Sequence, residues 1–252
     1  MKKRVFIFGD VHGINNSFLN MLESIKNKYK IEQNEPKKNN IIIIAGDCGF
    51  CFYGNSIYFP KAIRDAEIEK RKKLSKLPFT FVCVLGNHEN YDYIYSLPDA
   101  QIFGAKAFKE KGIDNIFYLK NGEILRINNK KIWTFGGGLS IDKKYRLENV
   151  SWWKDEIRLQ DFEKGKKKAI NNKIDYIITH DVPREIFYRM LPELKLIGKE
   201  CELQYYFDEI DALKRNEITN WFSGHYHPNK PLMYENGKYV VLPIMFCYEL
   251  EI

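Results

Sequence analysis

The sequence of 252 residues predicts a layered α/β fold. Short apolar runs recur along it, and their apolarity is continuous rather than alternating, which is typical of strands covered on both faces. Charged segments with apolar residues at helical spacing lie between several of these runs. Strands and helices that alternate in this way pack as layers around a shared core.

The predicted strands are short runs rich in β-branched and aromatic residues. They cover residues 4–8, 41–45, 79–85, 131–135, 174–179, 220–223 and 239–242.

The predicted helices cover residues 15–29, 61–77 and 203–214. Apolar residues of the first recur at i, i+4 and i+7, which places them on one face. The second helix carries few apolar residues among many charged ones, and the third helix has a clear apolar stripe. In chain order these apolar residues are Phe18, Leu22, Ile25, Ile63, Ala66, Leu74, Leu77, Leu203, Phe207, Ile210 and Leu213.

The composition indicates one folded domain over residues 1–252. Hydrophobic residues make up 44% and aromatic residues 15%, which excludes a disordered or collagen-like chain. No repeat, low-complexity tract or Pro/Gly/Ser linker divides the sequence. The net charge of +7 suggests an anionic partner. We interpret the basic run at 162–172 as a solvated helix end, with a phosphate or nucleic-acid patch as the alternative.

Targeting signals and cysteines predict a reduced, cytoplasmic protein with no membrane partner. The apolar run near the N-terminus is only VFIF, shorter than the ~7–15 residues of a secretory signal. Nothing approaches the ~18 apolar residues of a membrane span. The five cysteines do not suggest a disulfide framework. Cys48 and Cys51 form a C-x-x-C, but a zinc site or redox pair is disfavoured because no second such motif exists.

Every histidine lies just past the carboxyl end of a predicted strand, the edge where open α/β sheets bind ligands. Strand 4–8 leads into GDVHG, 41–45 into GDCG, 79–85 into GNHE, 174–179 into HD and 220–223 into GHYH. A lone histidine in a loop is usually a surface residue. The requirements of folding alone do not explain why so many of these strands lead into segments of glycine, aspartate and histidine.

The D-x-H and H-x-H spacings predict a metal site. Residues i and i+2 of an extended segment point the same way, and the adjacent glycines allow close backbone approach. Imidazole, carboxylate and amide donors together suit Mn, Fe, Zn, Co or Ni. The candidate ligands exceed what one ion needs, so two ions sharing a carboxylate would use them well. They are Asp10, His12, Asp47, Asn87, His180, His225 and His227.

These motifs, spanning residues 9–228, resemble the calcineurin-like metallophosphoesterase superfamily. The resemblance implies a four-layer α/β/β/α sandwich, with two mixed sheets flanked by helices and two divalent metals at the strand ends. Asp10, His12 and His227 would hold one metal.

The resemblance further implies that Asn87, His180 and His225 hold the other metal and that Asp47 bridges both. His88 would face the substrate without being a ligand. Mn²⁺ is the expected metal, with Fe, Zn, Ni or Co as alternatives.

One departure excludes a close match to the Ser/Thr protein phosphatases. That branch extends the second motif to GD-x-V-D-R-G, whereas this sequence has GDCGFCF. The carboxylate that orients the catalytic histidine and a phosphate-binding arginine are therefore missing. Asp92 or Asp142 would replace the carboxylate. Arg146 is the candidate phosphate contact beside Asn87 and His88, with a surface arginine as the alternative.

Two further features have a structural and a functional interpretation. Asp181 either steadies the metal-bound His180 or forms a turn before Val182-Pro183, and the turn is favoured. Trp152 and Trp153 either stack on a base or pack in the interior, and packing is favoured.

The expected function is metal-dependent hydrolysis of an anionic phosphoester, a small molecule or nucleotide. A hydroxide bridging the metals would be the nucleophile and His88 the general acid. The alternatives are a nuclease, a cyclic-nucleotide phosphodiesterase, a protein phosphatase and a binding scaffold without turnover. A nuclease would fit the positive charge, but no basic stripe interleaved with aromatics is evident.

Overall fold

The computed structural model describes residues 2–196 and 198–252, whose strands form two mixed sheets. The first sheet has parallel strands at its centre and antiparallel strands at its edges. In spatial order it contains β13 (Cys247–Leu250), β1 (Arg4–Phe8), β2 (Asn40–Ala45), β3 (Thr80–Val84), β6 (Ile116–Leu119), β5 (Ala105–Phe108) and β4 (Asp99–Ile102).

The second sheet repeats this plan, with parallel central strands and antiparallel edges. In spatial order it contains β11 (Leu232–Tyr234), β12 (Tyr239–Val241), β10 (Asn220–Ser223), β9 (Tyr176–Thr179), β8 (Lys130–Phe135) and β7 (Glu123–Ile127).

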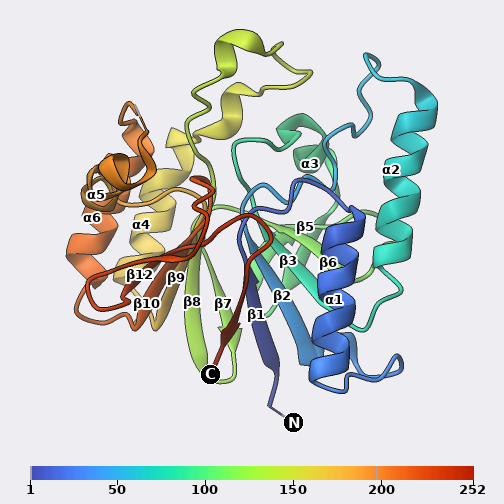
Figure 1. Cartoon of the computed structure of the whole chain (residues 1–252), viewed down its shortest axis with the longest axis horizontal. Helices are drawn as coiled ribbons and strands as arrows, with labels where there is room; N and C mark the ends of the chain where they lie inside the picture. Colours follow the sequence, from blue (N-terminus) through green and yellow to red (C-terminus); the bar gives the residue numbers. More distant parts are fainter. Residues whose placement is uncertain (1, 197) are drawn as a thin grey trace.

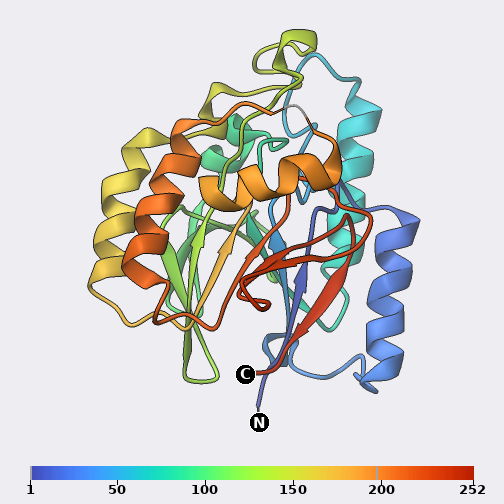
Figure 2. The ribbon, with the colours of Figure 1, turned by 60° about the vertical axis from the view of Figure 1, so that its left-hand side comes forward.

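Helices cover the outer face of each sheet (Figures 1 and 2). The first sheet is flanked by α1 (Asn16–Lys28), α2 (Lys61–Leu74) and α3 (Tyr91–Ser96). The second is flanked by α4 (Phe162–Ile170), α5 (Arg184–Leu194) and α6 (Glu202–Lys214). None of these helices is long and apolar enough to cross a bilayer. The predicted sandwich of two mixed sheets flanked by helices is confirmed.

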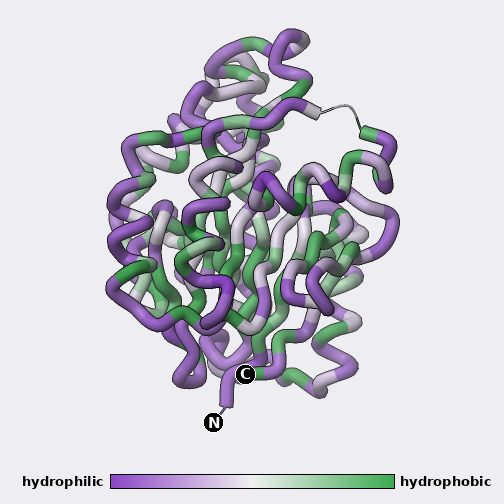
Figure 3. The backbone as a smooth tube through the Cα atoms, turned by 90° about the vertical axis from the view of Figure 1, so that its left-hand side faces the viewer, coloured by the Kyte–Doolittle hydropathy of each residue, from purple (hydrophilic) through white to green (hydrophobic). Residues whose placement is uncertain are grey.

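The central strands of both sheets are buried on both faces. Phe6 and Phe8 of β1 pack toward the helices, while Val5 and Ile7 face the second sheet. Figure 3 shows hydrophobic segments gathered in these strands and hydrophilic ones toward the outer helices. Because both faces are buried, the strands read as continuous apolar runs, and this is why the sequence revealed them.

All the predicted strands and helices form, but others were not predicted. Edge strands such as β4 and β11 are short and partly exposed, so they carry little apolar signal. The basic run at 162–172 lies mainly in α4, where Gly165 and Ala169 are buried, Lys164 and Lys167 are exposed, and Lys166 and Lys168 are half-buried. Lys166 pairs with Glu209 and Lys168 with Glu123, so the run forms a helix whose charges are partly paired.

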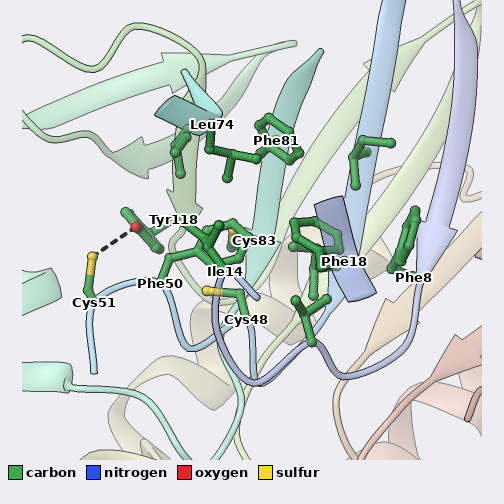
Figure 4. Packing of buried hydrophobic residues seen from close by; sticks show 14 of the residues in the cluster. Phe8, Ile14, Phe18, Cys48, Phe50, Cys51, Leu74, Phe81, Cys83 and Tyr118 are labelled. Carbon is green, nitrogen blue, oxygen red and sulfur yellow. Dashed lines mark hydrogen bonds between the residues drawn. The ribbon is translucent and has the colours of Figure 1, made fainter. Parts of the chain in front are cut away.

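Cys48 and Cys51 are free and buried in the core between the first sheet and its helices. Figure 4 shows them separated, with Cys51 hydrogen-bonded to the Tyr118 hydroxyl. Cys48 belongs to the same core as Cys83, and burial holds the pKa of Cys48 well above its usual value. A buried protonated thiol is a poor metal ligand and nucleophile, so this motif is part of the core.

The buried face of α2 is only partly the predicted one. Leu74 is buried as predicted, but Ile63 is 40% exposed and Ala66 is exposed, and the other buried residues are the charged Glu67 and Arg71. Leu213 of α6, predicted on the apolar stripe, is likewise 43% exposed.

Arg71 joins α2 to the loop that follows β2. Its Nη1 donates to the Phe50 carbonyl at 2.7 Å and to Glu67 Oε2 at 3.1 Å. Its Nε donates to Glu110 Oε2 at 2.7 Å. With only 1% of its surface exposed, Arg71 makes an ion-pair network that water screens little.

We expect Arg71→Met to lower the free energy of unfolding by about 3–5 kcal/mol, because it removes the cation beside the buried Glu67 and the half-buried Glu110. Lys72→Met on the same helix is the control. It removes an exposed pair with Glu69 and should cost under about 1 kcal/mol. Urea unfolding followed by circular dichroism measures both. Equal losses would contradict a structural role for the network.

Candidate metal centre

The candidate ligands come together where the carboxyl ends of the two sheets meet. Asp10 follows β1, Asp47 follows β2 and Asn87 lies beyond β3 in the first sheet, while His180 follows β9 and His225 lies beyond β10 in the second. The chain termini lie at the opposite end of the sheets (Figure 1).

Three donor atoms converge around Asp10. Its Oδ2 lies 2.6 Å from His227 Nε2 and 3.7 Å from His12 Nε2. The two imidazole nitrogens are 3.2 Å apart. The three atoms therefore lie close enough for one cation to bind them all. These residues form one of the acidic and histidine groups able to hold a metal ion.

A second group is formed by Asp10, Asp47 and His180. His180 Nε2 lies 3.6 Å from Asp47 Oδ2 and 2.9 Å from Asn87 Oδ1. The His225 ring lies beside it, with ring centroids 4.8 Å apart. All seven candidate ligands therefore lie in one region, and Asp10 belongs to both groups.

Backbone N–H groups bind one oxygen of each carboxylate, Asp10 and Asp47. His225 N–H donates to Asp10 Oδ1 at 2.9 Å, and His88 N–H donates to Asp47 Oδ1 at 2.8 Å. The Oδ2 atom of each carboxylate faces the imidazoles instead. The side chains are thus oriented by the backbone of a neighbouring strand end.

Burial and charge give the imidazoles different pKa values. Burial raises the pKa of Asp10, but the charge of His180 and the hydrogen bond with His227 bring it down to about 2. Burial lowers the pKa of His180, and the charges of Asp47 and Asp10 outweigh burial and raise it. Burial and the charge of His180 lower the pKa of His225 to about 3, so His225 stays neutral, the form that binds metals.

Four of the candidate ligands adopt left-handed backbone conformations. The φ angles are 51° for His12, 47° for Asp47, 72° for His225 and 47° for His227. Such conformations cost about 1–3 kcal/mol each in residues with a Cβ and cluster at functional sites. No feature of the sequence predicted this strain.

Three glycines make room for ligands on other strands. A Cβ on Gly46 would lie 1.9 Å from His180 Nδ1, one on Gly86 2.0 Å from Asp47 Oδ1, and one on Gly224 2.1 Å from Asp10 Oδ1. The sequence analysis expected glycines to allow close approach. The structure adds that each glycine serves a ligand distant in sequence.

Asp181 does not contact the His180 ring, because His180 Nδ1 pairs with the Ala45 carbonyl at 2.9 Å. Asp181 Oδ1 accepts from Val182 N–H at 2.8 Å and from the Tyr226 hydroxyl. The alternative of a direct partner for the His180 ring is wrong. Asp181 bends the chain toward Val182 as the favoured interpretation expected, but it is also buried and accepts from Gln204 at 3.3 Å.

His88 lies between the ligands and the loop at 139–161. Its ring centroid is 5.9 Å from that of His12, and its buried Nδ1 has no hydrogen-bond partner among the described residues. Burial lowers the pKa of His88, Asp47 opposes this, and Arg146 lowers it further.

Arg146 lines a cavity together with His12 and His88. Its Nε donates to Asp142 Oδ2 at 2.8 Å, and its Nη1 to the Ser151 carbonyl at 3.1 Å. The charge of Asp142 also acts on His88 and partly opposes the lowering of its pKa. Asp92 lies exposed on α3, so Asp142 is the better placed of the two predicted replacements.

The tryptophans pack. Trp153 is buried against Phe52, with ring centroids 5.8 Å apart, and Trp152 lies under the Lys143 ammonium. The favoured interpretation of these residues is confirmed for Trp153.

Glu89 supports the site in a way that the sequence analysis did not predict. Its buried Oε1 accepts from the N–H groups of Cys48 at 2.7 Å and Gly49 at 3.5 Å, which fixes the turn after Asp47. Burial and the charge of Asp47 raise the pKa of Glu89 to about 8. Glu89 is part of the GNHE motif, and this was the available signal.

Comparison with known proteins gives distant relatives. The lariat debranching enzyme of Danio rerio is 26% identical over 169 residues, covering 60% of this chain and 28% of that enzyme. The chain therefore spans well under two thirds of this relative.

Two solved structures are similar at low identity. The NAD nucleotidase of Haemophilus influenzae matches with a TM-score of 0.39 and 16% identity, over 96% of this chain and 50% of that one. The phosphopantetheinyl hydrolase of Mycobacterium tuberculosis matches with a TM-score of 0.48 and 9% identity, over 96% and 90%. These likenesses are too distant to identify a function.

The family comparison covers nearly the whole chain. The profile of the calcineurin-like phosphoesterases matches residues 3–229, which include all the candidate ligands and His88. The chain belongs to the calcineurin-like phosphoesterase family.

Proposed function

We propose that the protein hydrolyses phosphoesters with two divalent cations held by the seven candidate ligands. The convergence of Asp10, His12 and His227 is the observation that supports this most directly. Their three donor atoms face one another, and a cation placed between them would accept a lone pair from each.

The remaining ligands fit a second cation beside the first. Asn87, His180 and His225 surround the inner side of the site. Asp47, whose Oδ2 lies 3.6 Å from His180 Nε2, would bridge the two positions as the family resemblance implies, and Asp10, which belongs to both groups, would lie beside it. His180 Nδ1 pairs with the Ala45 carbonyl, which leaves Nε2 to face the ion. The mixed nitrogen and oxygen donors suit Mn²⁺, with Fe, Zn, Ni and Co as alternatives.

When bound, the cations would supply a hydroxide nucleophile and neutralise charge on the phosphoryl oxygens. The chain's own residues orient the reaction. His88 faces the open side of the site, where it would donate a proton to the leaving oxygen. Arg146 would contact a phosphoryl oxygen from the same side, held in place by Asp142.

We expect Asp47→Asn to impair metal retention more than substitution of any other single ligand, because Asp47 would serve both ions. Metal analysis after reconstitution with Mn²⁺ measures this. Asp114→Asn, on an exposed aspartate away from the site, is the control. Two ions per chain and a normal rate in Asp47→Asn would refute the bridging role.

We expect His88→Ala to reduce kcat about 10²–10⁴-fold on a phosphoester with an alkyl leaving group. The loss on para-nitrophenyl phosphate should be much smaller, because nitrophenolate leaves without a proton. Steady-state kinetics on both esters measures the difference. Equal losses on the two would mean that His88 does not act as the acid.

We expect Gly46→Ala to weaken Mn²⁺ binding about 10–100-fold, because its Cβ would displace the His180 ring. Gly112→Ala is the matched control, since Gly112 also has positive φ but no atom within 4 Å. Calorimetric titration with Mn²⁺ compares the two. An equal affinity for Mn²⁺ in the two variants would contradict the role of the contact between residue 46 and His180.

A further inference from the structure

Two cavities open from the metal centre and share the His88 side chain. The first, here called the Phe187 cavity, has a volume of about 310 Å³ and also borders Asn87, His225 and His227. The second, here called the Tyr53 cavity, has a volume of about 620 Å³ and borders His12. A phosphorus atom beside His88 would therefore have room for a substituent on each side.

Away from the ligands, Leu139, Ile141, Phe187 and Leu196 supply the apolar walls of the Phe187 cavity. Its polar lining includes Lys199 and two carboxylates that already have partners, since Asp142 pairs with Arg146 and Asp181 accepts from Gln204 and Tyr226. Such a cavity suits a compact, weakly polar group, because apolar walls favour burial of apolar surface.

The Tyr53 cavity combines aromatic rings with cations. Phe52 and Tyr53 are half-buried on its wall, and Lys70 and Arg146 lie at its edge. Glu67 also lines it, but its carboxylate is held by Arg71 and by backbone N–H groups. Asp142 pairs with Arg146, whereas Lys70 has no ion-pair partner within residues 2–196 and 198–252. Rings beside an unpaired cation suit a nucleotide, whose base stacks and whose phosphate is anionic.

From these cavities we infer that the substrate is a phosphodiester, with a nucleotide group in the Tyr53 cavity and a compact, less polar group in the Phe187 cavity. The inference rests on the proposed phosphoester hydrolysis. A monoester has one organic substituent and would leave one cavity empty. Hydrolysis breaks one P–O bond of the diester, adds the oxygen of water to phosphorus and passes a proton to the leaving oxygen.

Three chromogenic esters with the same leaving group test the inference on the Mn²⁺-loaded chain. They are the para-nitrophenyl ester of thymidine 5′-monophosphate, bis(para-nitrophenyl) phosphate and para-nitrophenyl phosphate. We expect kcat/KM to be at least about tenfold higher for the nucleotide diester than for the monoester, the scale of one stacked base. A monoester rate equal to or above that of the diester would overturn the inference while leaving phosphoester hydrolysis intact. Hydrolysis of none of the three would instead overturn the proposed function.

Variants of α2 test the Tyr53 cavity. Lys70→Ala and Ala66→Trp should each lower kcat/KM for the nucleotide diester about tenfold relative to bis(para-nitrophenyl) phosphate. Ala62→Trp is the matched control, because Ala62 is exposed one turn away and does not line the cavity. An unchanged ratio in both Lys70→Ala and Ala66→Trp would overturn the assignment of the nucleotide group.

Variants of the loop at 139–161 test the Phe187 cavity. Ile141 is 72% exposed, so Ile141→Trp narrows the cavity without disturbing the core. It should lower kcat/KM for both diesters about tenfold relative to the monoester. Leu147→Trp, 68% exposed on the same loop and lining neither cavity, is the control. If the ratio of diester to monoester kcat/KM were the same in Ile141→Trp and Leu147→Trp, the assignment of a second substituent to the Phe187 cavity would be overturned.

Discussion

The hydrogen bond from His225 N–H to Asp10 Oδ1 is the contact on which the site depends. Asp10 belongs to the first sheet and His225 to the second, so this bond sets how the two strand ends face each other. Gly224, directly before His225, allows the carboxylate to come this close. The second imidazole of the same loop, His227, then meets the other oxygen of Asp10. Asp10 thus aligns the two sheets and belongs to both groups of candidate metal ligands.

Packing below the site supports this alignment. The layer between the sheets contains alternate residues of β1 and β2, while the other residues of these strands pack against helices. Because both faces are buried, a one-residue shift would turn every side chain of a strand toward the opposite layer and disrupt the packing of both. The strained conformations of His12 and Asp47 therefore rest on a scaffold that cannot easily relax. Glu89 adds a local support by holding the turn after Asp47.

The sequence predicted the layered fold and the gathering of the candidate ligands well, because both depend on strong local patterns. Continuous apolar runs marked the central strands, and each ligand followed one of them. It predicted poorly what depends on tertiary contacts. Arg71 looked like one charge among many on α2, yet it is buried by partners from distant segments. The partner of His180 proved to be the Ala45 carbonyl rather than neighbouring Asp181, and a backbone acceptor leaves no trace in side-chain patterns. Edge strands such as β4 lacked a signal because one side of each remains unpaired and partly exposed.

The division of the donor atoms between the two sheets also links ligand binding to folding. In the group around Asp10, the carboxylate and His12 come from the first sheet and His227 comes from the second. An ion that binds there crosslinks the layers, and it binds the folded chain in preference to the unfolded one. At a concentration 100 times its dissociation constant, such an ion adds about 2.7 kcal/mol to the stability of the fold. The strained backbone around the site would then be maintained partly by the supply of the ion itself.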